Sequence, residues 1–245
     1  MGLRVAISSG WEQGQVVEGW PLVYTCKSVV EKVERNGSLP FVLPIVENLD
    51  LCHSLLDGMD LLVLSGEVLS IKRNVLEEHE TNVLRASNPL RYDNETALLR
   101  SAMKTGIPVL GICRGFQVMA AELGGEVQDE DVNEGNFIIH QQGKIAPPVK
   151  AVHSVRIAEG SLLRRLCEEE RAMVNSFHRQ AVRKVPPGFR VCALSDDGTI
   201  EAMESTSTHL ALGTQFHPEI LPSQIWDTFF KNLFVYLGES RDDRR

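Results

Sequence analysis

Several features that would indicate a membrane or nucleic-acid partner are missing from this 245-residue sequence. No apolar stretch approaches the length of a transmembrane helix. Basic residues are in the minority, because 25 Lys and Arg stand against 33 Asp and Glu and leave a formal net charge of −8. That balance argues against binding to nucleic acid or to an anionic membrane surface. We therefore expect no nucleic-acid partner and no membrane partner.

The sequence also lacks a CxxC pair and any Cys and His spacing typical of a metal site. Its five cysteines are an odd number, which indicates reduced thiols: Cys26, Cys52, Cys113, Cys167 and Cys192. The first residues show no apolar stretch of a secretory signal, and Ala6 stands where an acylation motif needs Ser or Thr. We expect a cytoplasmic protein without a cofactor or a bound metal.

Neither internal repeats nor low-complexity segments interrupt the chain, and a hydrophobic content of 43% is enough for one large core. We expect a single domain over residues 1–238, followed by a charged, frayed tail at 239–245. The first half alternates apolar runs with helical patterns, which predicts an α/β fold with a doubly wound, mostly parallel sheet. The second half turns to short β-like runs, which predict extra strands at 152–157, 189–194 and 199–203.

The individual elements follow from apolar periodicity. Buried strands are predicted at 3–8, 41–43, 60–64 and 107–110, and helices at 23–33, 49–56 and 94–105. The first of these helices is expected to stop near Asn36 and Gly37. A last helix is predicted from residue 223 to about residue 237.

One predicted turn carries a cysteine, in the run Gly-Ile-Cys-Arg-Gly at 111–115. The residues before it predict a buried strand and residues 116–123 predict a helix, so Cys113 lies at the apex of a tight turn. Small residues on both sides allow a cramped backbone, and the helix N-terminus stabilises a thiolate, the reactive form of cysteine. A nucleophile elbow and a buried structural cysteine both fit this turn taken alone.

A candidate base lies far downstream, where another apolar run ends in His217, Pro218 and Glu219. Cysteine catalysis needs an imidazole to move the proton and a third group to orient that imidazole. Pro218 fixes its own φ angle and disfavours helix at His217, which limits how the two side chains lie. A solvated surface loop also fits these three residues taken alone. The two motifs together favour a cysteine-dependent site, because both follow predicted strands and ligands bind beyond the carboxyl ends of parallel strands.

Further segments accompany these two motifs. They are Tyr-Asp-Asn-Glu at 92–95, Gly-Ile-Pro-Val-Leu at 106–110, Phe-Gln at 116–117, Gly-Gly at 124–125, His-Ser-Val at 153–155, Val-Asn-Ser-Phe-His-Arg-Gln-Ala at 174–181, Asp-Asp-Gly-Thr-Ile-Glu-Ala at 196–202 and Gly-Thr-Gln-Phe at 213–216. Together they resemble the class I glutamine amidotransferase-like superfamily, and within it the γ-glutamyl hydrolase branch, peptidase C26. The resemblance is dense over 92–219 and looser over 3–66. Arg114 is more similar to the hydrolase branch than to ammonia-delivering synthetase subunits, which usually carry Leu or Tyr there.

The resemblance implies a class I glutamine amidotransferase-like, flavodoxin-like fold and a small-molecule γ-glutamyl substrate. It implies that Cys113 is the nucleophile, that His217 is the base and that Glu219 orients the imidazole. It places the backbone N–H groups of Gly66 and Arg114 in the oxyanion site. The residues that it implies for the substrate pocket are Gln117, Asn175, Ser176, Phe177 and His178.

Other polar residues near the expected site have roles in this interpretation. Arg114, Arg179 and Glu134 are candidate charge partners for the α-amino and α-carboxylate groups of the substrate. The long polar loop at 129–149 is expected to cover the site and to select the leaving amine. A charged run at 77–80 is expected to form a solvated helix or flap rather than a metal site.

Two other expectations concern polar residues outside this group. His140 and His153 are expected to be structural histidines with satisfied hydrogen bonds. After the third strand the sequence reads Ser65, Gly66, Glu67, where the hydrolase branch usually has two glycines and an aspartate. Because a residue with a Cβ resists positive φ, we expect this loop to present its amide differently, which puts the second oxyanion donor in question.

Three functions are compatible with these residues. The first is a stand-alone hydrolase that cleaves the γ-amide bond of γ-glutamyl compounds through a thioester, for which a homodimer is allowed. The second is a glutaminase that delivers ammonia to a synthetase partner. The third is a non-catalytic binder that retains the fold. The presence of Cys113, His217 and Glu219 together favours the first.

Overall fold

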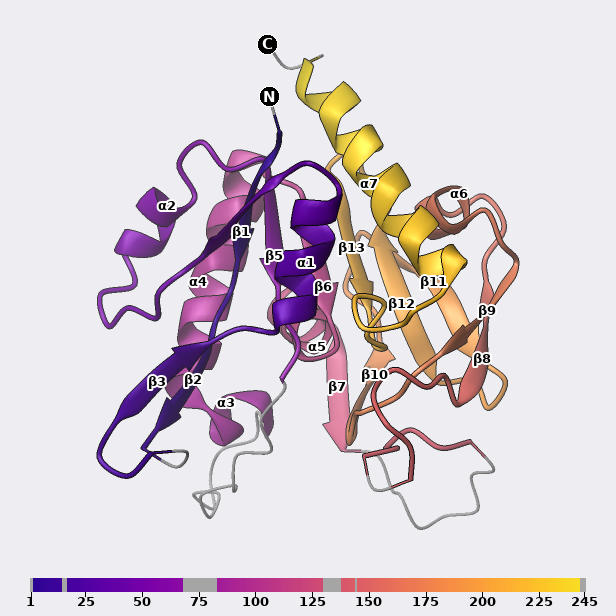
Figure 1. Ribbon diagram of the computed structural model, residues 1–245, viewed down its shortest axis with the longest axis horizontal. Helices are drawn as coiled ribbons and strands as arrows, with labels where there is room; N and C mark the ends of the chain where they lie inside the picture. The colour runs from indigo at the N-terminus through magenta and orange to yellow at the C-terminus, as the bar shows by residue number, and fades with distance from the viewer. Residues whose placement is uncertain (1, 15–16, 68–82, 130–137, 144, 243–245) are drawn as a thin grey trace.

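The computed structural model describes residues 2–14, 17–67, 83–129, 138–143 and 145–242 (Figure 1). Its main sheet has 11 strands, and its longest path follows the order β4-β1-β5-β6-β13-β12-β11-β8-β9. The first strands of this path pair in parallel: β4 (Leu39–Val42), β1 (Arg4–Ile7), β5 (Leu61–Leu64), β6 (Val109–Ile112) and β13 (Ala211–Thr214). The parallel part of the sheet confirms the α/β fold that the sequence predicts.

The other strands of the main sheet extend it from β13 in antiparallel fashion. They are β12 (Ile200–Ser205), β11 (Phe189–Ser195), β8 (His153–Ile157) and β9 (Arg171–Val174), while β10 (Gln180–Lys184) pairs with β12 and with β7 (Glu126–Asp129). The three strands expected in the C-terminal half correspond to β8, β11 and β12. Strands β7, β9 and β10 were not predicted, because short, partly exposed runs rich in charged residues show no apolar pattern.

Helices cover both faces of the parallel strands, because successive side chains of a strand point to opposite faces. Leu61 and Val63 of β5 belong to the apolar cluster that includes α1 (Lys27–Arg35) and α7 (Gln224–Asp242). Leu62 and Leu64 belong to the cluster on the other face. That second cluster includes α2 (Leu51–Leu55), α4 (Pro89–Thr105) and α5 (Arg114–Glu122). Two short helices, α3 (Val83–Ser87) and α6 (Leu162–Cys167), pack beside α4 and α7, respectively.

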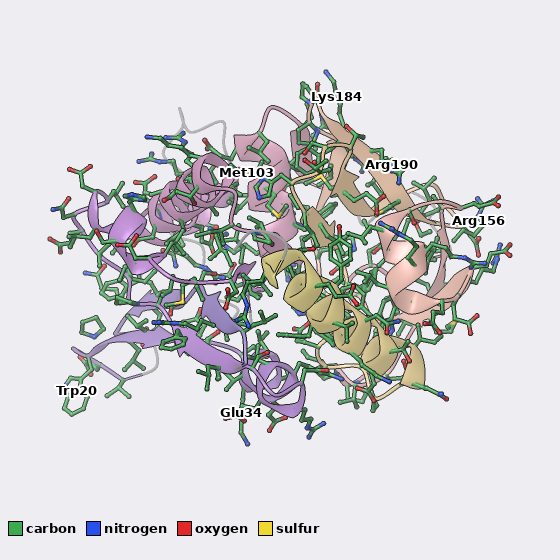
Figure 2. The ribbon with its side chains drawn as sticks, turned by 90° about the horizontal axis from the view of Figure 1, so that it is seen from above. Trp20, Glu34, Met103, Arg156, Lys184 and Arg190 are labelled. Carbon is green, nitrogen blue, oxygen red and sulfur yellow. The ribbon has the colours of Figure 1, made fainter. Side chains whose placement is uncertain are left out.

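The helix predicted at 23–33 begins later than expected. Residues Pro21–Tyr24 form a strand, β3, which pairs antiparallel with β2 (Gly10–Gln13) in a separate two-stranded sheet. Its Leu-Val-Tyr sequence favours extended backbone, and the cap of α1 is Cys26. The end of α1 is as predicted, with Asn36 as its cap. Figure 2 shows Trp20, which is 68% exposed, at the periphery beside this small sheet.

Two helices are longer than predicted. Helix α4 begins at Pro89, where the Asn88 side chain accepts a hydrogen bond from the N–H of Arg91. Helix α7 continues to Asp242, and its Arg241 lies 3.4 Å from the Asp60 carboxylate. Residues 239–242 are thus helical rather than a frayed tail, whereas 243–245 lie outside the described residues. Among the described helices, none is both long enough and apolar enough to cross a membrane.

Candidate active site

Cys113 lies at the apex of the turn between β6 and α5, as the sequence predicts. Its φ of 50° and ψ of −103° are strained for a residue with a Cβ, at a cost of about 1–3 kcal/mol. The neighbouring glycines are required by close contacts rather than by positive φ. A Cβ at Gly115 would collide with the carbonyl of Leu64, and one at Gly111 would meet the sulfur of Met119. The turn therefore presents the cysteine at the N-terminus of α5, where free N–H groups favour a thiolate.

His217 lies directly after the end of β13, next to Cys113. The Cys113 N–H donates to the carbonyl of Thr214 at 2.7 Å, which aligns the ends of the two strands. The charge of Cys113 acts on the ring of His217, whose Nδ1 lies 2.8 Å from Oε1 of Glu219. All three side chains are buried. A cysteine, an imidazole and a carboxylate thus meet in one buried group, in which a hydrogen bond joins the imidazole to the carboxylate.

The electrostatics of this group favour a protonated imidazole. Burial alone would lower the pKa of His217, but the charges of Glu219 and of the Cys113 thiolate together raise that pKa well above its usual value. An imidazolium near the nucleophilic sulfur is placed to give a proton to the leaving group.

The other cysteines are less suited to nucleophilic chemistry. Burial raises the pKa of the Cys52 and Cys192 thiols and raises that of Cys167 to about 12. Cys26 is half-buried at the start of α1 and bonds to the Ser28 hydroxyl. Of the five cysteines, Cys113 is therefore the one placed beside an imidazole at a tight turn.

The loop after β5 lies against the ring of His217. A Cβ at Gly66 would collide with Cε1 of the imidazole, so only glycine fits this position. Buried Arg91 donates to the carbonyls of Ser65 at 2.9 Å and Gly66 at 3.2 Å. Because C=O and N–H point in opposite directions in a trans peptide, the N–H of Gly66 points away from Arg91.

The departure from the family pattern at Ser65 does not require a left-handed backbone. Among the described residues other than glycine, φ is positive only at Cys113 and Glu168. The Ser65 hydroxyl and N–H bond to Ser8 on the neighbouring strand end, at 2.9 Å each. A serine therefore fits the position without strain.

A network of charged side chains contacts the loop after β5 on the side of α4 and α5. Glu95 of α4 accepts hydrogen bonds from Arg91 at 2.7 Å and from Arg114 at 3.2 Å. Glu67 lies 3.8 Å from Arg91 and 3.6 Å from Arg114. The Arg114 side chain, a candidate substrate partner from the sequence, thus lies within the protein, next to the loop. The segment 92–95 showed a family resemblance, but no sequence signal indicated this pairing.

Gln215 is a site residue that was not predicted from the sequence. Its Nε2 lies 3.7 Å from the sulfur of Cys113. Gln117, expected in the substrate pocket, donates to Oε1 of Gln215 at 3.1 Å and to the carbonyl of Gln180 at 2.8 Å. Gln117 therefore orients the Gln215 amide. The position of Gln215 two residues before His217, on the same strand end, was the available signal.

The segment expected to line the pocket lies beside His217. Asn175 accepts the His217 N–H at 2.8 Å and donates to the His217 carbonyl at 3.3 Å, so it positions the backbone of the imidazole. Ser176 is buried and its N–H donates to Gln142. The Phe177 ring lies edge-on to the imidazole, with 6.2 Å between ring centroids. His178 instead faces Glu201, at 3.7 Å.

Some expected residues lie elsewhere. Arg179 is exposed. Glu134 and the charged run at 77–80 lie outside the described residues, as does part of the loop predicted at 129–149.

Comparisons with known proteins show the family to which the chain belongs. The model of the peptidase C26 family matches residues 5–219, which include the loop after β5, the cysteine turn and the His-Pro-Glu segment. The chain belongs to the peptidase C26 family. This membership confirms the resemblance that the sequence motifs indicate, and it is typical of hydrolases related to glutamine amidotransferases.

Two relatives illustrate the range of the family. The chain is 33% identical to protein NtpR of Enterococcus hirae over 208 residues. The matched region covers 84% of this chain and 85% of that protein. It is 30% identical over 188 residues to γ-glutamyl-γ-aminobutyrate hydrolase PuuD of Escherichia coli K12, covering 75% of this chain and 73% of the relative.

Solved structures confirm the fold. One from Thermoplasma acidophilum, described as part of a putative GMP synthase, superposes with a TM-score of 0.69 over 100% of this chain and 98% of its own, at 19% identity. A glutamine amidotransferase from Thermotoga maritima superposes with a TM-score of 0.58 over 98% of this chain and 86% of its own, at 16% identity. The protein therefore has a class I glutamine amidotransferase fold, as expected.

Proposed function

We propose that this protein hydrolyses the γ-amide bond of γ-glutamyl compounds through a thioester on Cys113 and releases glutamate and an amine. The observation that carries the proposal is the buried group of Cys113, His217 and Glu219 at a strand-to-helix elbow, in which His217 hydrogen bonds to Glu219. The 30% identity to a γ-glutamyl-γ-aminobutyrate hydrolase supports the substrate class.

The reaction begins with attack of the Cys113 thiolate on the γ-carbonyl carbon, which forms a C–S bond and a tetrahedral oxyanion. The His217 imidazolium then gives its proton to the amide nitrogen, and the C–N bond breaks to release the amine. Neutral His217 next removes a proton from water, which attacks the thioester. Collapse of this second intermediate breaks the C–S bond, releases glutamate and restores the thiolate.

The remaining groups hold this chemistry in place. Glu219 accepts from Nδ1 and keeps Nε2 directed to the reacting atoms. The Arg114 N–H at the first position of α5 and the Gly66 N–H are the donors proposed for the oxyanion. The N–H of Gly66 suits this role because Arg91 binds the carbonyl of the same peptide from the opposite side.

The test is glutamate release from a panel of γ-glutamyl amines, with free glutamine in the same panel. We expect at least one γ-glutamyl amine to have a higher kcat/KM than glutamine, and Cys113→Ala to abolish release. Cys26→Ala, a change at a thiol away from the elbow, is the matched control and retains activity. Turnover of glutamine alone, stimulated by a copurifying synthetase, would instead favour ammonia delivery. Absence of release from every substrate would favour a non-catalytic binder.

A further inference from the structure

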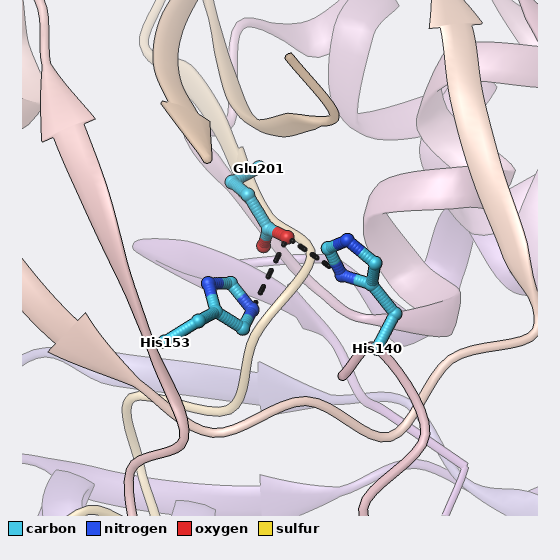
Figure 3. Close-up of side chains that lie close together, drawn as sticks. All are labelled: His140, His153 and Glu201. Carbon is cyan, nitrogen blue, oxygen red and sulfur yellow. Dashed lines mark ion pairs between the residues drawn. The ribbon is translucent and has the colours of Figure 1, made fainter. Parts of the chain in front are cut away.

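A second group of buried titratable side chains shares no residue with the group of Cys113, His217 and Glu219. Figure 3 shows His140, His153 at the start of β8 and Glu201 of β12 converging on one point. Nδ1 of His140 and Nε2 of His153 lie 3.5 and 3.6 Å from Oε1 of Glu201. The three atoms lie within 4.8 Å of one another, and all three residues are buried.

Within the described part of the chain, the atoms at the centre of this cluster have no hydrogen-bond partner. Nδ1 of His140, Nε2 of His153 and both carboxylate oxygens of Glu201 are buried and unsatisfied. Buried polar atoms are almost always paired, so several together at one point require an explanation. The expectation that His140 and His153 are satisfied structural histidines is therefore wrong for the nitrogens that face Glu201.

In His140 and His153, the ring nitrogen that faces away from Glu201 carries the hydrogen, which leaves the lone pair on the nitrogen that faces Glu201. Nδ1 of His153 lies 3.3 Å from the carbonyl of Ser154, which only accepts, so this nitrogen carries the hydrogen and Nε2 carries the lone pair. Nε2 of His140 lies 2.8 Å from Oδ2 of Asp197, which leaves Nδ1 as the inward lone pair. Lone pairs and a carboxylate that face one another repel unless a cation lies between them.

Glu201 supplies a carboxylate at this point, and carboxylate oxygens are ligands for zinc.

The spacing fits a metal ion better than it fits hydrogen bonds. Separations of 3.5 and 3.6 Å are too long for good hydrogen bonds. Ligand atoms of a tetrahedral zinc ion with bonds of about 2.0–2.1 Å are about 3.4 Å apart. The group within this spacing consists of His140, His153 and Glu201.

We propose that His140, His153 and Glu201 bind one Zn²⁺ ion. Imidazole and carboxylate are common zinc ligands, and two histidines with one glutamate leave the fourth position of a tetrahedral ion open to water. Asp197 completes the arrangement as the outer partner of His140, a carboxylate–histidine–metal series that orients the ligand. Asp197 is itself held by the Ser195 hydroxyl and the Thr199 N–H.

The proposed ion would join three separate parts of the C-terminal half. His140 precedes Gln141, which forms an isolated bridge with Phe177. Zinc would therefore join the segment around residue 140 to β8 and β12. This proposal departs from the expectation of a metal-free protein, because the ligands are far apart in the sequence.

The test is zinc binding by the full-length chain. After removal of metals with a chelator, the protein is titrated with ZnCl₂ in competition with a chromogenic chelator, and bound zinc is measured by elemental analysis. We expect one equivalent per chain and a rise in Tm. Replacement of zinc by Co²⁺ is expected to give the visible absorption bands of tetrahedral coordination.

Variants show where the ion binds. Glu201→Gln and His153→Gln are expected to lose stoichiometric binding, and Asp197→Asn, which touches no metal, to weaken it about 10–100-fold. His53→Asn, at an exposed histidine of α2, is the matched control and keeps one equivalent. Cys113→Ala also keeps it, because the ion does not lie at the thiolate.

Three results would overturn the proposal. They are less than stoichiometric zinc on the wild-type protein, equal binding by Glu201→Gln, and loss of binding in Cys113→Ala. The first would mean that protons alone hold the cluster together. Circular dichroism of each variant confirms folding, and the wild-type titration decides the question even where a variant does not fold.

Discussion

At the scale of single residues, the charge on His217 depends on its two side-chain partners. Burial opposes the imidazolium, and the charges of Glu219 and Cys113 favour it more strongly. Asn175 adds no charge but bonds to both the N–H and the carbonyl of His217. Asn175 therefore fixes the backbone of His217, and the charges of Glu219 and Cys113 favour protonation of its ring.

His217 and Glu219, which assist Cys113 in the proposed reaction, differ in importance. His217 moves the proton in both half-reactions, so His217→Asn is expected to lower kcat about 10³–10⁴-fold. Glu219→Gln keeps the shape and a weaker hydrogen bond, and we expect a loss of about 10²-fold. Steady-state kinetics with the best substrate of the panel measures both. An unchanged kcat in His217→Asn would reject the assignment of this residue as the base.

The raised pKa of His217 also predicts how stability depends on pH. Its protonation stabilises the fold fully below the unfolded-state pKa of about 6.5, and this contribution is lost as pH rises through the folded-state pKa. We expect the wild-type protein to exceed His217→Asn in free energy of unfolding most near pH 6.5 and progressively less at higher pH. Urea titrations across this range measure the difference. A difference that grows with pH would contradict the raised pKa.

The site residues that belong to a local sequence motif could be predicted from the sequence. Those whose role depends on contacts between distant parts of the chain could not. Cys113 and His217 follow predicted strands, and Glu219 is two residues from its partner, so their proximity could be predicted. Gln215 contacts the sulfur through an amide that Gln117 orients from another element. Such contacts depend on side-chain packing between elements that are far apart in the sequence. The periodicity of apolar residues gives no information about that packing.

At the scale of elements, two turns meet at the ends of parallel strands. The turn after β6 carries Cys113 and the loop after β5 carries Gly66. The strands pair directly, with Leu64 opposite Gly111, so the two turns are adjacent. The parallel sheet was predicted because strands and helices alternate in the first half. The start of α1 was not, because the apolar residues of β3 fit a helical pattern equally well.

The loop after β5 depends on the missing side chain of Gly66. In Gly66→Ala the added Cβ collides with the imidazole of His217 and must displace the ring or the loop. A shift of about 1 Å at the reacting groups is expected to lower kcat about 10²-fold. Kinetics and a Tm measurement are made together, and Gly238→Ala serves as the control, because Gly238 has no positive φ and a Cβ there meets no described atom within 4 Å. Full activity in Gly66→Ala would show that the contact is not required.

At the scale of the whole molecule, the main sheet has a parallel half and an antiparallel half, and each contributes different residues. The parallel half provides the cysteine turn and the loop beside it, and the antiparallel half provides Asn175 and the cluster around Glu201. His217 follows β13, which pairs in parallel with β6 and antiparallel with β12. The candidate site therefore lies where the sheet changes from parallel to antiparallel pairing.

Glu95 joins α4, α5 and the loop after β5 through one buried carboxylate, and its removal should affect the entire fold. Glu95→Gln leaves Arg91 and Arg114 without their closest charge partner, and we expect the free energy of unfolding to fall by about 3–5 kcal/mol. Urea unfolding measures this as a lower midpoint with an unchanged slope. The matched change Glu122→Gln breaks an ion pair with Arg100, which is 70% exposed, and is expected to cost less than about 1 kcal/mol. Equal losses in the two variants would mean that the buried network contributes no more than a surface pair.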